Sequence, residues 1–112
     1  MKIQAYQQGD VSILEPKGKL MGGPDTGELD EKLYALLSEG KKKVVLDLGK
    51  TEWINSSGIS ILIHHWNKFN KAGAHLCLAN LTKKTERILV ISRLASVFDC
   101  YDTVADAVAS FK

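Results

Sequence analysis

The residues best suited to chemistry form a short polar cluster, Asn55-Ser56-Ser57-Gly58, near the middle of the chain. The cluster follows a short apolar run ending at Asp47 and precedes an amphipathic segment, which predicts a strand, a turn and the start of a helix. Small hydroxyl and amide side chains cap the free N–H groups of a first helical turn, and that end of a helix favours negative charge. The cluster could therefore serve only as a helix cap, or it could also accept a phosphate without harm to the fold.

A serine at a strand-to-helix turn could also be a catalytic nucleophile. The Gly-x-Ser-x-Gly pattern of hydrolase nucleophile elbows does not occur here, because Ile54 stands two residues before Ser56. His64 and His65 follow about two helical turns later, which is too far for either to act as a base for Ser56. We therefore expect no enzymatic activity.

The sequence favours neither a metal site nor a cofactor site. His64 and His65 are adjacent and diverge by about 100° on a helix, whereas helical metal pairs are spaced i, i+4. The glycines match neither the Walker nor the dinucleotide-binding pattern. Cys77 in a predicted buried strand and Cys100 in a late edge segment form no Cys-x-x-Cys pair. They are expected to be free structural thiols in a reducing compartment.

Length and composition predict one small globular domain that spans residues 1–112. The chain has 45% hydrophobic and 25% charged residues, which is typical of such domains. No apolar run approaches the roughly 18 residues of a membrane span, and the first residues lack the apolar core of a secretory signal. We expect a cytoplasmic protein without membrane insertion. The basic run Lys41-Lys42-Lys43 lacks interleaved aromatic residues, which argues against nucleic-acid binding.

The N-terminal part predicts an antiparallel hairpin. Residues 2–6 and 11–14 are strand-forming runs joined by a polar link with a glycine at position 9. Pro16 is expected to place the second strand at an edge or to end it. A long connection through Gly18, Leu20, Met21 and Pro24 is expected to follow.

A first helix is predicted from Pro24 to near Gly40, with Asp25 and Glu28 as its cap. One face of this helix is apolar and the charged residues are expected to face solvent. The apolar face consists of Leu29, Leu33, Leu36 and Leu37, and the solvated face carries Asp30, Glu31 and Lys32.

The helix that starts at the serine cluster is predicted to end at Gly73. Its apolar stripe should face the core, whereas Ile61 and His65 should point outward or toward the margins of the core. An outward Ile61, one turn from the serines, would suit a docking patch. The stripe consists of Ile59, Leu62, Ile63, Trp66 and Phe69.

The last third alternates strands and helices. Strands are predicted at residues 76–79 and 97–101, separated by a helix that Thr82 caps and that runs toward Leu94. A terminal helix should begin after Thr103, with Asp106 at capping-box spacing, and pack through its apolar face of Ala105, Val108 and Ala109. The predicted fold is α/β, with a small mixed sheet of four to five strands, an N-terminal antiparallel hairpin and about four helices.

Taken together, these motifs resemble a known family. Asp47-Leu48, a short turn with an aromatic residue, Asn55-Ser56-Ser57-Gly58-Ile59 and Leu62 resemble the signature of STAS domains. Within that family the chain is most similar to the small single-domain anti-sigma factor antagonists, over nearly all 112 residues.

The resemblance implies roles for individual residues. Ser56 takes the position of the phosphorylated serine, with Ser57 as second choice, while Asn55 replaces the usual aspartate. In a loop that usually reads Gly-Glu-Leu-Asp and faces the partner, Lys19 and Met21 replace both acidic residues. The implied partner-binding residues are Leu20, Met21, Asn55, Ser56, Ser57, Gly58, Ile59 and Ile61.

The function implied by the resemblance is a switch. The unphosphorylated protein, a monomer or weak dimer, would bind an anti-sigma factor that is also a serine kinase and so release a sigma factor. A serine phosphatase would reverse the phosphorylation, and the kinase rather than this chain would bind ATP and Mg²⁺. Two alternatives stay open. One is a STAS scaffold or adaptor subunit of a transporter or signalling assembly without a phosphoswitch. The other is a ligand sensor or enzyme that uses the serine turn as an anion site.

Overall fold

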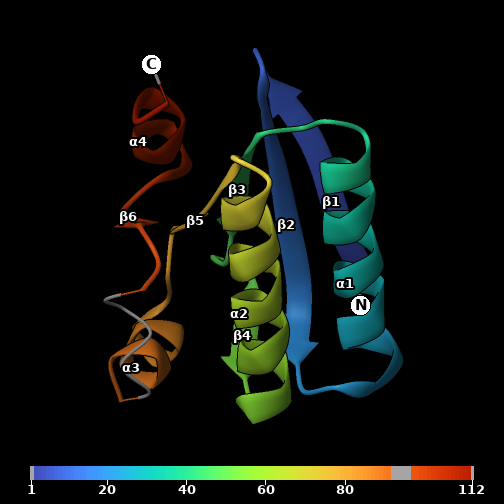
Figure 1. The fold of residues 1–112 in the computed structure, drawn as a ribbon. Coiled ribbons are helices and arrows are strands. Elements are labelled where there is room, and N and C mark those ends of the chain that lie inside the picture. The colour runs from blue at the N-terminus through green and yellow to red at the C-terminus, as the bar shows by residue number, and fades with distance from the viewer. Residues whose placement is uncertain (1, 92–96, 112) are drawn as a thin grey trace.

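The structure is a computed structural model that describes residues 2–91 and 97–111 (Figure 1). The described elements, in chain order, are β1 (Lys2–Gln8), β2 (Val11–Leu20), α1 (Gly23–Ser38), β3 (Lys43–Asp47), β4 (Thr51–Ile54), α2 (Ser56–Lys71), β5 (His75–Ala79), α3 (Lys83–Ile91), β6 (Cys100–Tyr101) and α4 (Val104–Ala109).

The described strands form one six-stranded mixed sheet in the order β1-β2-β3-β5-β6, with β4 paired to β2. The β1–β2 hairpin is antiparallel and the other pairs are parallel, as predicted. The extra strand is β4, whose residues we expected to form a polar turn. This strand pairs only with β2 among the described strands, and its Glu52 and Trp53 are exposed. Its sequence therefore has no continuous apolar run, which is the pattern that would have predicted a buried strand.

Strand β2 continues through Pro16 to Leu20, so the prediction of an edge strand or an irregular exit at this proline was wrong. The carbonyl of Pro16 accepts a hydrogen bond from Thr51 Oγ1 at 3.0 Å and therefore points away from β1. The Pro16 nitrogen points the same way. On that side β2 pairs with β3 at residues 12–14 and with β4 from Gly18 onward, so Pro16 lies between the two pairings. A proline is tolerated in this central strand because no ladder bond is needed at that point.

The sheet buries apolar side chains on both faces, with α1 and α2 packed side by side against one of them (Figure 1). The central strand β3 is buried throughout its apolar residues, as predicted. Helix α4 covers a second apolar cluster, on the strands β2, β3 and β5. Of its predicted face Val108 packs there as expected, whereas Ala105 and Ala109 are exposed and Ala107 is buried instead. Cys77 also lies in that cluster, where burial raises the pKa of its thiol to about 12 and keeps it protonated.

Helix and strand ends follow the capping predictions in part. Thr82 Oγ1 accepts the Thr85 N–H at 3.2 Å, and Thr103 Oγ1 accepts the Asp106 N–H at 3.0 Å. Strand β6 is limited to Cys100–Tyr101, shorter than the predicted 97–101. The predicted end of α3 near Leu94 lies outside the described residues.

Helix α1 begins at Gly23, one residue earlier than predicted, with Gly22 as its N-cap. The Gly22 N–H donates to Thr26 Oγ1 at 2.7 Å. The hydroxyl of a threonine in the first helical turn thus gives this backbone N–H a hydrogen-bond partner. The side chain of Asp25, and with it the predicted cap formed with Glu28, lies outside the described part of the structure.

His65 is buried, with 1% of its surface exposed, so the expectation that it points outward or toward the margins was wrong. Its Nε2 lies 2.5 Å from Asp30 Oδ1 on α1. The Asp30 side chain is 48% exposed, so it lies on the solvated face as expected and also contacts α2 through this carboxylate. The two helices pack closely enough here for a polar contact to replace solvent. Burial lowers the pKa of His65, an effect that Asp30 partly offsets, so the imidazole stays neutral and donates from Nε2.

The buried imidazole predicts a pH-dependent stability. The unfolded chain binds a proton on His65 near its ordinary pKa of about 6.5, whereas the folded chain resists protonation until a lower pH. The stabilisation is therefore present above about pH 6.5 and declines as the pH falls toward the folded pKa. In urea unfolding from about pH 7.5 to about pH 5, His65→Gln should lose less stability than wild type. His64→Gln, at an exposed neighbour, should follow wild type; parallel curves for all three proteins would contradict the assignment.

Candidate functional site

Helix α2 begins at Ser56, directly after β4, and Asn55 is its N-cap. Asn55 Oδ1 accepts the Gly58 N–H at 3.0 Å, which satisfies one free donor of the first helical turn. This bond also fixes the orientation of the side-chain amide, because only the oxygen can accept. The Asn55 Nδ2 group therefore faces the other way and donates to the carbonyl of Met21 at 2.9 Å.

Asn55 thus ties the end of β2 to the start of α2 at two points. Besides the side-chain bond to Met21, its backbone N–H donates to the Leu20 carbonyl at 3.0 Å. A carboxylate at position 55 could still cap the helix but could not donate to the Met21 carbonyl. The asparagine that departs from the family tetrad therefore makes a contact that the usual aspartate could not make.

Gly58 allows α2 to approach β2 at the same place. A Cβ at this position would lie 2.5 Å from the Leu20 carbonyl oxygen and 2.9 Å from the Leu20 Cβ, which is closer than atoms can pack. Gly22, in the link that follows β2, has a φ of 89° and would place its own Cβ 3.3 Å from Ser57 Cβ. The glycines on both sides of the contact are therefore required by the geometry of the turn.

The close approach at Gly58 predicts a large effect of one methyl group. Gly58→Ala should lower the free energy of unfolding by about 1–3 kcal/mol, because the backbone of Leu20 must move. Gly27→Ala is the matched control, since Gly27 lies in α1 with open space where a methyl group would extend and should gain about 0.5–1 kcal/mol from helix propensity. Chemical denaturation of both variants checks this, and equal effects would contradict the packing argument.

The two bonds of the Asn55 side chain can be separated by substitution. Asn55→Ser keeps an acceptor for the Gly58 N–H but has no donor for Met21, whereas Asn55→Ala loses both. The Met21 carbonyl and the Gly22 N–H belong to the same peptide group, so loss of the bond to Met21 should loosen the Gly22 amide. In hydrogen exchange, the serine variant should retain protection at Gly58 and exchange roughly 3- to 10-fold faster at Gly22, given about 1 kcal/mol per bond. The alanine variant should lose protection at both amides. Asn67→Ser, at an exposed position of α2, is the control; an unchanged Gly22 in Asn55→Ser would refute the tether.

The surface around the turn combines exposed hydroxyls with exposed apolar side chains. Ser56 and Ser57 are both exposed, and Met21 is 47% exposed. Trp53, the last residue but one of β4, is 42% exposed and precedes Ser56 by three residues in the sequence. Sequence reasoning missed Trp53 because it lay in the supposed turn, although an aromatic residue just before the serine cluster was visible.

Other predicted partner-binding residues lie deeper. Leu20 is fully buried and Gly58 is buried, so both support the turn from below and do not form its outer surface. Ile59 and Ile61 are half-buried, which leaves part of each side chain at the surface. The outward Ile61 expected from the helical pattern is thus only partly exposed.

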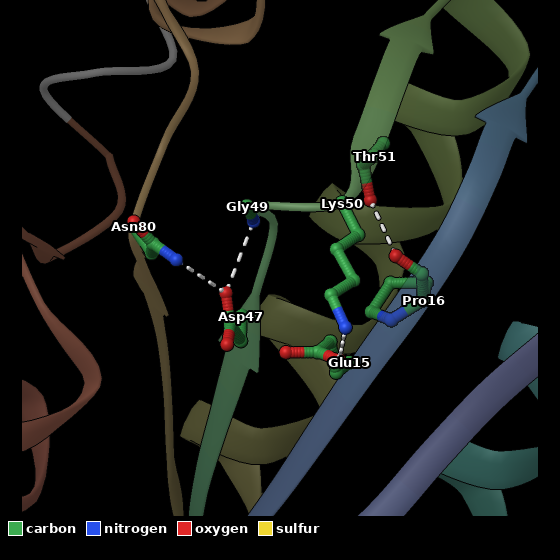
Figure 2. Close-up of polar contacts among 7 residues, drawn as sticks. All are labelled: Glu15, Pro16, Asp47, Gly49, Lys50, Thr51 and Asn80. Carbon is green, nitrogen blue, oxygen red and sulfur yellow. Dashed lines mark hydrogen bonds and ion pairs between the residues drawn. The ribbon is translucent and has the colours of Figure 1, made fainter.

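A second polar cluster holds the link that leads into β4 (Figure 2). Asp47, at the end of β3, is buried, and its Oδ1 accepts from the Gly49 N–H at 3.0 Å and from Asn80 Nδ2 at 3.2 Å. Lys50 forms an ion pair with Glu15 at 3.3 Å on the neighbouring strand. The aspartate of the Asp-Leu motif therefore anchors the connection between β3 and β4, and through it the position of the serine turn.

The histidines do not join this site. His65 is buried against Asp30 between α1 and α2, and His75 begins β5. Among the described side chains of residues 2–91 and 97–111, no three from His, Cys, Asp or Glu gather as a metal ion would require. No helix in those ranges is long and apolar enough to cross a membrane.

A mixed sheet with three consecutive crossover helices and an exposed serine turn at the start of α2 defines a STAS-type domain. The sequence profile of the STAS domain matches residues 2–107, and the chain belongs to this family. A relative from Bordetella bronchiseptica, named "Putative anti-sigma factor antagonist BtrV", is 28% identical over 85 residues, covering 76% of this chain and 73% of that protein.

Solved structures share the fold. The crystal structure of a "putative anti-sigma factor antagonist" from Thermotoga maritima has a TM-score of 0.89 at 23% identity, over 96% of this chain and 92% of that one. The Bacillus cell fate determinant SpoIIAA in its phosphorylated form has a TM-score of 0.76 at 12% identity, over 99% of this chain and 100% of that one. At these identities the structures establish the architecture alone.

Proposed function

We propose that this chain is an anti-sigma factor antagonist switched by phosphorylation of Ser56. In its unphosphorylated form it binds an anti-sigma factor that is also a serine kinase, and a sigma factor is released. The observation that carries the proposal is the placement of Ser56: it is exposed and is the first residue of a helix whose start is tied to β2. The names of the relatives support the same partner class.

The physical basis of the switch is charge at a fixed position. A phosphoserine carries roughly −1.5 to −2 charges and three acceptor oxygens. At the N-terminus of α2 the helix dipole tolerates that charge, so the domain stays folded. In a docked interface beside Met21 and Trp53 the phosphate would be desolvated, which typically costs about 2–5 kcal/mol. That corresponds to roughly 30- to several-thousand-fold weaker binding.

The surroundings of the two serines favour Ser56 over Ser57 as the phosphate acceptor. The Ser57 side chain already lies against the Gly22 link, where a Cβ would be 3.5 Å from its Oγ. A phosphate on Ser57 would therefore press on the β2–α1 link. Ser56 precedes it on the helix and contacts Ser60 only through its backbone carbonyl, at 2.9 Å. Ser57 remains the second choice.

The remaining partners follow from the proposed chemistry. The kinase, and not this chain, binds ATP and Mg²⁺, a serine phosphatase restores the binding form, and all three proteins act in the cytoplasm. SpoIIAA, which shares the fold, has been solved in a phosphorylated form, which supports a phosphate-bearing state for a domain of this architecture. Asn55 adds no negative charge beside the acceptor, so an incoming phosphate meets less repulsion than it would beside an aspartate.

The proposal predicts one dominant phosphorylation site. After incubation with ATP, Mg²⁺ and soluble extract of the host, mass spectrometry should locate phosphate on Ser56 of wild type and of Ser57→Ala. Ser56→Ala should remain unlabelled. Extract proteins retained on immobilised Ser56→Ala should include a kinase that Ser56→Asp retains at least roughly 30-fold more weakly.

Two outcomes would contradict the proposal in different ways. Absence of phosphate from both serines, while a control substrate is labelled, would favour the scaffold or adaptor alternative. Equal retention of a partner by Ser56→Ala and Ser56→Asp would support the partner and contradict the proposal that charge at Ser56 controls its binding. An anion or nucleotide bound at the turn, with turnover, would instead favour the ligand-sensor alternative.

A further inference from the structure

We propose that the outer edge of β1 pairs with the same edge of a second copy of this chain, so that two sheets join into one continuous sheet. Among the described strands, β1 pairs only with β2, which leaves its other edge open. An open edge presents a row of unpaired N–H and C=O groups that can pair with another strand. The interface would be formed by residues 2–8.

The backbone groups that face outward can be assigned from β2. The carbonyl of Pro16 and the N–H of Gly18 bond to Thr51 and Lys50, on the side of β2 away from β1. Because backbone direction alternates along a strand, Ser12 and Leu14 also turn away from β1. Their register partners in β1 therefore have no ladder bond to β2 and direct their backbone groups outward: Ile3, Ala5 and Gln7.

The usual protection of an edge strand is largely absent from β1. Natural edges are shortened, carry charges or proline, contain bulges, or lie under another element. Strand β1 has seven residues in unbroken register with β2, contains no proline, and carries a single charge, Lys2, at one end. All of its residues except Ile3 are exposed, and Tyr6 is 40% exposed.

The sequence of β1 is complementary to itself in an antiparallel pair centred on Ala5. This register uses all seven residues and places outward-facing groups opposite one another, with Ala5 facing Ala5 of the second copy and Ile3 facing Gln7. On the other face Tyr6 lies opposite Gln4 and Lys2 lies opposite Gln8. Lys2 carries the only charge of the strand, and the two copies of Lys2 therefore do not face each other. The backbone hydrogen bonds set the spacing of the two strands, and the small alanines bring no side-chain clash at the symmetry axis.

We assign the partner at this edge as a second copy because β1 can pair with itself over its whole length and no like charges face each other in that register. The Ser56 turn lies on the other side of β2, next to β4, and takes no part in the pairing. Both copies would therefore keep a free docking surface. The dimer does not depend on the phosphoswitch, and either can fail without the other.

The test places charges at the symmetry axis. Opposite residues in an antiparallel pair have Cβ atoms about 4.5–5.5 Å apart, so Ala5→Lys or Ala5→Glu sets like charges against each other. By analytical ultracentrifugation, wild type should show a concentration-dependent species of twice the 12.3 kDa chain mass. Each variant alone should require at least roughly 10-fold higher concentration to form it. An equimolar mixture of the two variants should restore the dimer, because opposite charges then meet.

The matched control uses Ala105, an exposed alanine on α4, substituted in the same two ways. Those variants should associate like wild type, and circular dichroism should show all proteins folded. A wild type that stays monomeric up to near-millimolar concentration would overturn the proposal. So would Ala5 variants that associate like wild type, or a mixture that associates no better than its components.

Discussion

The contact between the end of β2 and the start of α2 is the constraint on which the site depends. Two hydrogen bonds from Asn55 reach the carbonyls of Leu20 and Met21, and Gly58 lets the helix backbone approach Leu20 without a side chain between them. Residues separated by more than thirty positions in the sequence are thereby held in one turn. The exposed hydroxyl of Ser56 is presented from this fixed base.

The rest of the fold supports that contact from both sides. The Asp47 cluster holds the link between β3 and β4, and the β2–β4 ladder brings Ile54 beside Leu20. Because the start of α2 is tied to the sheet at these points, the proposed phosphate at Ser56 is expected to change the surface potential of the turn and to leave the core as it is.

Local patterns predicted the elements well, and long-range pairing accounts for what they missed. The start of α2, the Thr82 and Thr103 caps and the buried β3 follow from residues that are neighbours in sequence. Strand β4 and the continuation of β2 through Pro16 exist because the two strands pair with each other. The paired residues are far apart in the sequence, so a pattern of neighbouring residues does not reveal the pairing. The same holds for His65, which was expected to point outward or toward the margins of the core but is buried where the half-exposed Asp30 of the neighbouring helix contacts it. The tether from Asn55 to Met21 likewise needed the structure, although the asparagine itself stood out in the tetrad.

A decisive measurement compares backbone amide NMR spectra of the protein before and after stoichiometric phosphorylation of Ser56. We expect shift changes confined to the first turn of α2, the β2–α1 link and the end of β4, with the spectrum of the core strands unchanged. Widespread changes in β3 and β5, or loss of the folded spectrum, would contradict the claim that a charge acts at a turn that does not move.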